Sequence, residues 1–175
     1  MIIWIDGTFG IGKTAAANEL LNKLPESEVI DFDEFIKSVR IENQMEILFG
    51  RRYPEANKSY VNALADCLNN KIRTNPSRNI IVPIALITDY CRDNLVETIN
   101  NKAETIHFIL FSSKEKMLER IEKQGGRDLD LAITYYDEAT SYLQTNYKDA
   151  IRINTEKMTI KEVVSCLEEF IADGR

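Results

Sequence analysis

The amino-acid sequence predicts an α/β fold in which helices flank both faces of a five-stranded parallel sheet. Short apolar runs rich in strand-forming residues alternate with helical patterns along the chain, as in parallel sheets with crossover helices. The chain has 175 residues, of which 44% are hydrophobic, and this suits one compact core. No repeat, linker or low-complexity segment divides it. We therefore expect a single domain over residues 1–175.

Five strands are expected where short apolar runs end at turn-forming residues. The run IIWI stops at a glycine-containing loop, and TIHFILF is apolar almost throughout, which is typical of a strand buried on both faces. In the third run, Pro83 must lie at the end of the strand, because proline donates no ladder hydrogen bond. The predicted strands are residues 2–5, 28–32, 80–86, 105–111 and 150–154.

Helices are expected between these strands and after the last one, where apolar residues recur at helical spacing. Pro25 and the Gly125-Gly126 pair each end a helix, and Ser113 is a candidate N-cap. The lone His107 in the fourth strand is interpreted as a satisfied core residue. The predicted helices are residues 13–24, 34–48, 57–73, 93–101, 112–124, 129–147 and 160–171.

Composition and charge argue against several classes of function. A net charge of -6 and a pI near 5.0 disfavour nucleic-acid binding, because phosphate backbones require a dense basic surface. No apolar run approaches the roughly 18 residues of a membrane span, and no secretory leader pattern precedes the first strand. Three widely spaced cysteines and one histidine favour reduced thiols over disulfides or a zinc site. We expect a cytoplasmic protein without an integral membrane segment.

The loop GTFGIGKT, residues 7–14, joins the first strand to the first helix and matches the phosphate-binding (P-loop, or Walker A) pattern G-x-x-x-x-G-K-[ST] in full. Its glycines let backbone N–H groups approach phosphate oxygens, and the helix N-terminus favours negative charge. We expect Lys13 to reach the β- and γ-phosphates of a nucleotide and the Thr14 hydroxyl to ligate Mg²⁺. The residues predicted to bind the nucleotide here are Gly7, Phe9, Gly10, Ile11, Gly12, Lys13, Thr14 and Ala15.

Two carboxylates leave the second strand at the edge where ligands gather in parallel sheets. Either Asp31 or Asp33 would hold a Mg²⁺-bound water or accept the proton of a substrate hydroxyl. The alternative is local, since Asp31 and Glu34 have the spacing of a capping box and Asp33 alone is a good helix cap. Asp33 is the residue that we favour for catalysis. The acid that often follows the third strand is missing, and Pro83 stands there instead.

Basic residues near a glycine pair supply the positive charge that a transferring phosphoryl group requires. Arg120 and Arg127 lie on either side of Gly125-Gly126, which suits a segment that closes over phosphates. A solvated basic helix face is the alternative. The run Arg51-Arg52-Tyr53 is a weaker candidate for an acceptor pocket, with an exposed polar turn as its alternative.

The block MIIWIDGTFGIGKT resembles the start of the tunicamycin resistance protein family, a branch of the P-loop, nucleoside-kinase-like ATP-binding proteins. Two further blocks, IIVPIALIT and HFILFSSKEKMLERI, follow in the family's order, so the resemblance spans residues 1 to about 121. It implies the kinase-like strand order 2-3-1-4-5, ATP with Mg²⁺, and a lid after the fourth strand. It also supports Gly12, Lys13 and Thr14 as the phosphate and metal site. The sequence IVP at residues 81–83, in the third strand, looks like a feature shared with the family.

The same resemblance suggests roles for residues outside the P-loop. Arg120 and Arg127 look like lid arginines, and Asn154-Thr155 resemble a pair that lies near the adenine in related kinases. We therefore expect a small-molecule phosphotransferase of the P-loop NTPase fold, with Lys13, Asp33, Arg120 and Arg127 as catalytic residues. Its acceptor would be tunicamycin-like or nucleotide-like. The alternatives are a non-catalytic, ATP-dependent protein that sequesters a drug or other ligand, and a nucleoside monophosphate kinase.

Overall fold

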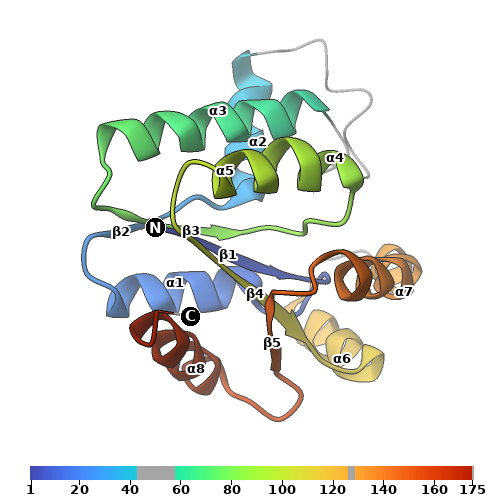
Figure 1. Cartoon of the computed structure of the whole chain (residues 1–175). Helices are drawn as coiled ribbons and strands as arrows, with labels where there is room; N and C mark the ends of the chain where they lie inside the picture. Colours follow the sequence, from blue (N-terminus) through green and yellow to red (C-terminus); the bar gives the residue numbers. More distant parts are fainter. Residues whose placement is uncertain (43–57, 126–128, 175) are drawn as a thin grey trace.

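A computed structural model describes residues 1–42, 58–125 and 129–174, and its centre is a five-stranded sheet in the order β2-β3-β1-β4-β5 (Figure 1). Every neighbouring pair of strands is parallel. Both the strand number and the order predicted above are confirmed. The strands are β1 (Ile2–Gly7), β2 (Ser27–Val29), β3 (Asn79–Pro83), β4 (Thr105–Phe111) and β5 (Ile151–Asn154).

Helices cover both faces of this sheet (Figure 1). On one face, α1 (Lys13–Lys23) packs against α8 (Ile160–Ala172). On the other lie α2 (Phe32–Glu42), α3 (Lys58–Thr74) and a continuous helical stretch made of α4 (Asp89–Cys91), the π-helical turn η3 (Arg92–Val96) and α5 (Glu97–Asn100). Helices α6 (Lys114–Gln124) and α7 (Leu129–Asn146) pack against each other.

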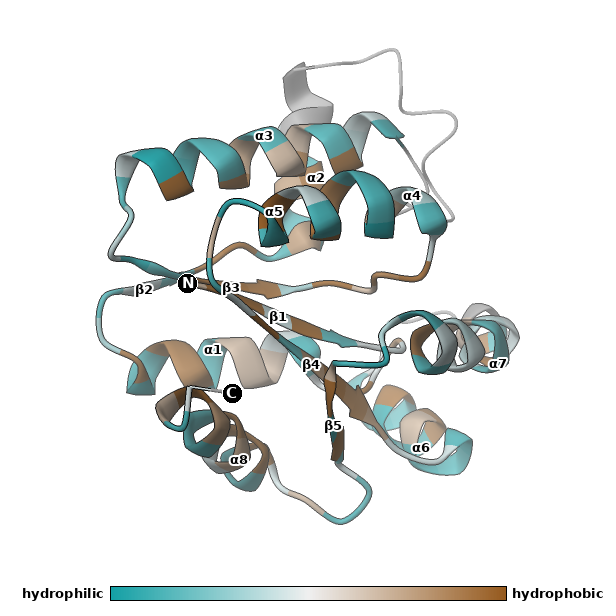
Figure 2. Ribbon diagram, in the orientation of Figure 1, coloured by the Kyte–Doolittle hydropathy of each residue, from teal (hydrophilic) through white to brown (hydrophobic). Residues whose placement is uncertain are grey.

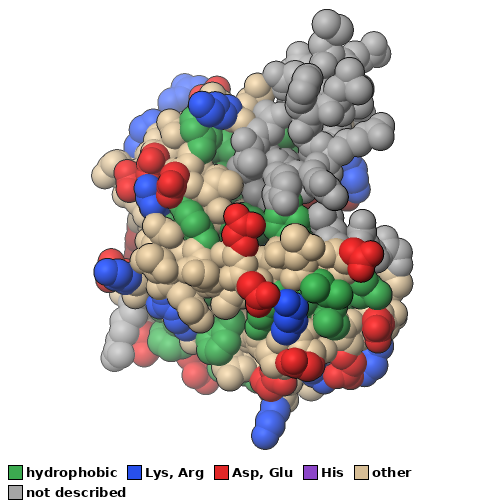
Figure 3. Space-filling view, turned by 90° about the vertical axis from the view of Figure 1, so that its right-hand side faces the viewer, with side chains coloured by type: hydrophobic (Ala, Val, Ile, Leu, Met, Phe, Trp, Pro, Cys, Tyr) green, Lys and Arg blue, Asp and Glu red, His purple; other side chains and the backbone are tan. Residues whose placement is uncertain are grey.

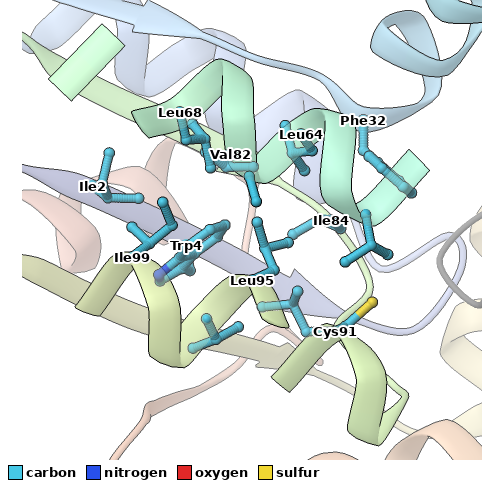
Figure 4. Packing of buried hydrophobic residues seen from close by; sticks show 14 of the residues in the cluster. Ile2, Trp4, Phe32, Leu64, Leu68, Val82, Ile84, Cys91, Leu95 and Ile99 are labelled. Atoms are coloured by element: carbon cyan, nitrogen blue, oxygen red, sulfur yellow. The ribbon is translucent and has the colours of Figure 1, made fainter. Parts of the chain in front are cut away.

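Alternate residues of β1 point into two separate apolar cores. Ile2 and Trp4 belong to the core under α3, η3 and α5, where Figure 4 shows Trp4 beside Leu95 and Ile99. Ile3 and Ile5 belong to the core under α1 and α8. The hydropathy colouring agrees, because the apolar stripes of these helices face the sheet (Figure 2). Each fully buried large side chain contributes roughly 1.5–3 kcal/mol, so β1 is the strand that the fold depends on most.

Three predicted element boundaries are wrong for identifiable reasons. The second strand ends at Val29, and α2 begins at Phe32 because the Asp31 side chain caps it. The third strand ends at Pro83 instead of residue 86. The helix expected from residue 93 begins at Asp89, because the Thr88 hydroxyl accepts the Cys91 N–H and so forms an N-cap. The predicted site residues Arg127 and Arg51-Arg52-Tyr53 lie outside the described residues.

The described surface agrees with the acidic composition. On the face seen in Figure 3, Asp and Glu side chains are scattered among Lys and Arg, and the coloured residues form no continuous basic surface. Among the helices of the described ranges, none has the length and apolar character that crossing a membrane requires.

Candidate functional site

The P-loop connects β1 to α1 in close contact with neighbouring elements. A Cβ atom on Gly7, whose φ is 143°, would lie 2.5 Å from the backbone oxygen of Leu110 on β4. A Cβ atom on Gly10, whose φ is 70°, would lie 2.4 Å from the Ile121 side chain on α6. Both positions therefore exclude side chains by space as well as by backbone conformation.

The loop presents positive charge where an anion would enter. The Lys13 Nζ donates hydrogen bonds to the backbone oxygens of Gly7, at 2.8 Å, and Thr8, at 2.9 Å. Gly12 is the N-cap residue of α1, so no side chain caps that helix, and its first turn holds no acidic residue. Backbone N–H groups at an uncapped helix N-terminus are suited to phosphate oxygens. The residues present thus fit a nucleotide's phosphates.

The Thr14 hydroxyl forms a hydrogen bond with a carboxylate in the segment between β2 and α2. Its Oγ1 donates to Asp31 Oδ2 at 2.9 Å. The other carboxylate oxygen, Oδ1, accepts the backbone N–H groups of Asp33, at 3.0 Å, and Glu34, at 3.2 Å. The capping role that the sequence offered for Asp31 is found in the structure, and the same carboxylate also contacts Thr14, the predicted metal ligand. Hydroxyl and carboxylate oxygens at one point are ligands that suit Mg²⁺.

A cleft open to solvent runs beside the P-loop. Its walls come from four segments: the P-loop with the start of α1, the start of α2, the end of β3 with the chain that follows it, and the last residue of α6. Lys13 is the one cation of the described lining, and Asp31 and Asp33 are its acids. The lining residues are Phe9, Gly10, Gly12, Lys13, Thr14, Ala15, Asp31, Phe32, Asp33, Pro83, Ile84, Ala85 and Gln124.

The sequence matches no protein-family model and no curated protein. Solved structures, in contrast, resemble the chain over nearly its whole length. The tunicamycin resistance protein of Deinococcus radiodurans superposes with a TM-score of 0.76 at 23% identity, covering 97% of this chain and 94% of that one. Shikimate kinase from Bacteroides thetaiotaomicron superposes with a TM-score of 0.64 at 20% identity, covering 98% of both chains. For deoxyadenosine kinase from M. mycoides, the TM-score is 0.57 at 13% identity, with 100% of both chains covered.

The chain has the P-loop kinase fold. At these identities the likeness is one of fold alone. The strand order that the family resemblance implied is the order found in the structure. In this P-loop kinase fold the cleft lies at the carboxyl ends of β1 and β3, the edge where open parallel sheets bind ligands.

Arg120 lies on α6, the helix after β4, and its guanidinium donates to two loops. Its Nη1 donates to the Thr155 hydroxyl at 2.9 Å and to the Ile11 backbone oxygen at 3.4 Å, and its Nη2 donates to the Thr155 backbone oxygen at 2.5 Å. It is not among the residues that line the cleft. These contacts join the P-loop to the loop after β5, and they favour a positioning role for Arg120 over direct contact with a transferring phosphoryl group.

The two residues predicted near the adenine differ in exposure. Thr155 is only 2% exposed and donates to the Phe111 backbone oxygen through both its N–H, at 2.8 Å, and its hydroxyl, at 3.1 Å. Asn154 is exposed, and its side chain accepts the Glu156 N–H. Thr155 therefore belongs to the framework of the P-loop kinase fold, while the Asn154 side chain is accessible to a ligand.

Sequence reasoning missed Glu156 and Asp6. The Glu156 carboxylate accepts the backbone N–H of Ser113 at 2.7 Å and the Ser113 hydroxyl at 2.9 Å. These hydrogen bonds hold the pKa of the Glu156 carboxyl below its usual value. Asp6 is fully buried directly before the P-loop. A charged residue at the end of an apolar strand is a visible signal for Asp6, whereas no local pattern marks Glu156.

Proposed function

We propose that this protein is an ATP-dependent phosphotransferase that phosphorylates a hydroxyl group of a small molecule. The observation that carries the proposal is the meeting, in one cleft, of the P-loop residues Lys13 and Thr14 with the carboxylates of Asp31 and Asp33. In this proposal residues 1–175 form one catalytic domain that works in the cytoplasm.

The P-loop would hold ATP through its backbone N–H groups, the α1 N-terminus and the Lys13 ammonium. Lys13 donates to the neutral backbone oxygens of Gly7 and Thr8, and a phosphate oxygen is a stronger acceptor than these because it is charged. Thr14 and Asp31 are the residues that would hold Mg²⁺. When bound, Mg²⁺ neutralises phosphate charge and orients the phosphates.

Asp33 would act on the acceptor. Both oxygens of Asp31 are engaged, one by backbone N–H groups and one by Thr14, whereas the Asp33 side chain is exposed at the cleft. The acceptor hydroxyl gives its proton to Asp33 as its oxygen bonds to the γ-phosphorus. The bond from that phosphorus to the bridging oxygen breaks, and ADP departs with the electron pair. We retain Arg127 as the predicted cation for the transferred group.

The described lining also bears on the acceptor's charge. A nucleoside monophosphate brings a second phosphate, which requires a cation of its own. Within the described lining of the cleft, Lys13 is the one Lys or Arg side chain, and the ATP phosphates would engage it. A nucleoside or a tunicamycin-like molecule brings no second phosphate and so requires no further cation from the described lining.

A protein that binds ATP and sequesters a ligand without chemistry is the second candidate. Its support is Pro83, which ends β3 where an acid would help to hold the metal. The contact between Thr14 and Asp31 weakens this argument, because it brings a carboxylate to the predicted metal ligand from the neighbouring connection.

Phosphorus NMR of the protein with MgATP and a panel of acceptors distinguishes the candidates. The panel holds tunicamycin, nucleosides and nucleoside monophosphates. A new phosphoester signal that requires both acceptor and Lys13 supports the proposal, with Lys13→Ala as the test and Lys23→Ala, at the exposed end of the same helix, as the matched control. ATP that binds but stays intact with every acceptor favours sequestration.

A further inference from the structure

Asp6 is a fully buried carboxylate that none of the roles above uses. It lies on β1 immediately before Gly7, the first residue of the P-loop. Burying a charged side chain costs several kcal/mol unless hydrogen bonds and a partner compensate. The contacts of Asp6 should therefore indicate what it does.

One Asp6 oxygen joins the P-loop to the opposite wall of the cleft. Oδ1 accepts the backbone N–H of Gly7 at 2.7 Å and that of Leu86 at 3.1 Å. Leu86 directly follows Ile84 and Ala85, which line the cleft on the β3 side. A single carboxylate oxygen thus fixes the distance between two segments that are 80 residues apart.

The Leu86 contact replaces a hydrogen bond that the regular sheet would make. Along the β1–β3 pair, Ile80 N–H donates to the Met1 oxygen, and Ile84 N–H donates to the Ile5 oxygen. In a parallel ladder, donor and acceptor each advance by two residues, so Leu86 N–H would next donate to the Gly7 oxygen. It donates to Asp6 instead, and the Gly7 oxygen accepts the Lys13 ammonium at 2.8 Å.

The second Asp6 oxygen has a partner on the other side of β1. Oδ2 lies 3.1 Å from Nε2 of His107, which pairs in register with Trp4 from β4. The His107 ring packs edge-on against Tyr147, with the ring centroids 4.7 Å apart. His107 is thus a satisfied residue, as the sequence predicted, and it compensates the buried carboxylate while leaving Oδ1 to the two backbone donors.

We infer that Asp6 is a positioning residue for the phosphate site. By accepting the N–H groups of both Gly7 and Leu86, it fixes the first residue of the P-loop against the chain that follows β3, and with it the loop backbone that would bind phosphate. The inference rests on the nucleotide-binding part of the proposed function and is independent of transfer to an acceptor.

The test compares Asp6→Ala with Asp6→Asn. Asparagine keeps an oxygen at the same reach, whereas alanine removes the acceptor. MgATP affinity is measured by calorimetry well below each variant's thermal midpoint. We expect Asp6→Ala to weaken MgATP binding at least tenfold and Asp6→Asn to stay within about threefold of the parent, corresponding to differences of about 1.4 and 0.6 kcal/mol.

A matched control separates positioning from stability. Glu28 on β2 is a partly buried carboxylate paired with Lys71 at 2.6 Å. Glu28→Ala should lower the thermal midpoint while MgATP affinity is kept. If folded Asp6→Ala binds MgATP as the parent does, or if alanine and asparagine weaken binding equally, the inference is wrong.

A second pair of variants decides the matter if Asp6→Ala does not fold. Asp6→Glu keeps the charge but displaces the oxygens by one methylene, so it should weaken MgATP binding at least tenfold while Asp6→Asn does not. The reverse result would show that charge matters and oxygen position does not, and it would overturn the inference. Absence of MgATP binding by the parent protein would instead contradict the proposed function.

Discussion

The two sides of the cleft are built differently. The P-loop is enclosed by other elements, because Gly10 packs on Ile121 of α6 and Gly12 lies under Ile160 of α8. The opposite side is the exposed beginning of α2. There Asp33 is open to solvent, and Asp31 accepts a hydrogen bond from the Thr14 hydroxyl. A triphosphate is the same in every nucleotide, so a fixed loop suits it, whereas acceptors vary and suit an accessible helix end.

Lys13→Ala should have the largest effect, since it removes the charge of the enclosed side. We expect kcat for phosphoryl transfer to fall by roughly 10²–10³-fold, the range typical for loss of one electrostatic stabiliser. Turnover of MgATP with the acceptor found by NMR measures the effect, and Lys23→Ala should match the parent. A Lys13→Ala protein with full turnover would contradict the assignment of the P-loop.

The two carboxylates on the exposed side should give different defects. Asp33→Asn should lower kcat by about 10²-fold, the lower end of the range for a general base, with little change in MgATP affinity, because a general base acts on the acceptor alone. Asp31→Asn should raise the Mg²⁺ concentration needed for activity while stability is kept, because asparagine caps a helix as well as aspartate does. Mg²⁺ titrations of turnover, with melting curves, test both. If the two variants gave the same Mg²⁺ dependence and the same loss of kcat, Asp31 and Asp33 would not have the separate roles proposed for them.

Gly10→Ala tests how firmly the enclosed side is packed. The added methyl would meet the Ile121 side chain at 2.4 Å and would also require a positive φ, so we expect a loss of about 1–3 kcal/mol in the free energy of unfolding. Gly174→Ala is the control, because its φ is also 65° and nothing lies within 4 Å of the added atom. Urea denaturation should show a larger loss for Gly10→Ala. Equal losses would mean that the contact with α6 contributes nothing.

Glu156→Gln should have the smallest effect, and that effect should depend on pH. The folded pKa of Glu156 is held below the model-peptide value of 4.5 by the hydrogen bonds from Ser113, so its charge stabilises the fold above that value. The stabilisation is lost as pH falls through the lowered pKa. Thermal midpoints of parent and variant should therefore differ slightly at neutral pH and converge in acid. A difference that stays constant with pH would contradict this linkage.

What the sequence could predict depended on how far apart the interacting residues lie. The P-loop was predicted residue by residue because its motif is contiguous and its flanking strand and helix are local. Asp31 was ranked below Asp33 because its contact with Thr14 spans 17 residues, and only the cap was visible nearby. The partners of Arg120 lie 35 residues ahead, at Thr155, and 109 residues behind, at Ile11, so the sequence showed only its charge, the nearby glycine pair and the family resemblance.

The position of β1 in the middle of the sheet has a consequence for synthesis. Residues 2–7 leave the ribosome before both strands that flank them, and Ile160, which covers Gly12, follows much later. Because domains are made from the N-terminus onward, a nascent chain contains residues 7–14 long before it contains the strands and helices that pack around this loop. Under the proposed function, MgATP should therefore protect the full-length chain from unfolding more than it protects chains that stop before α8.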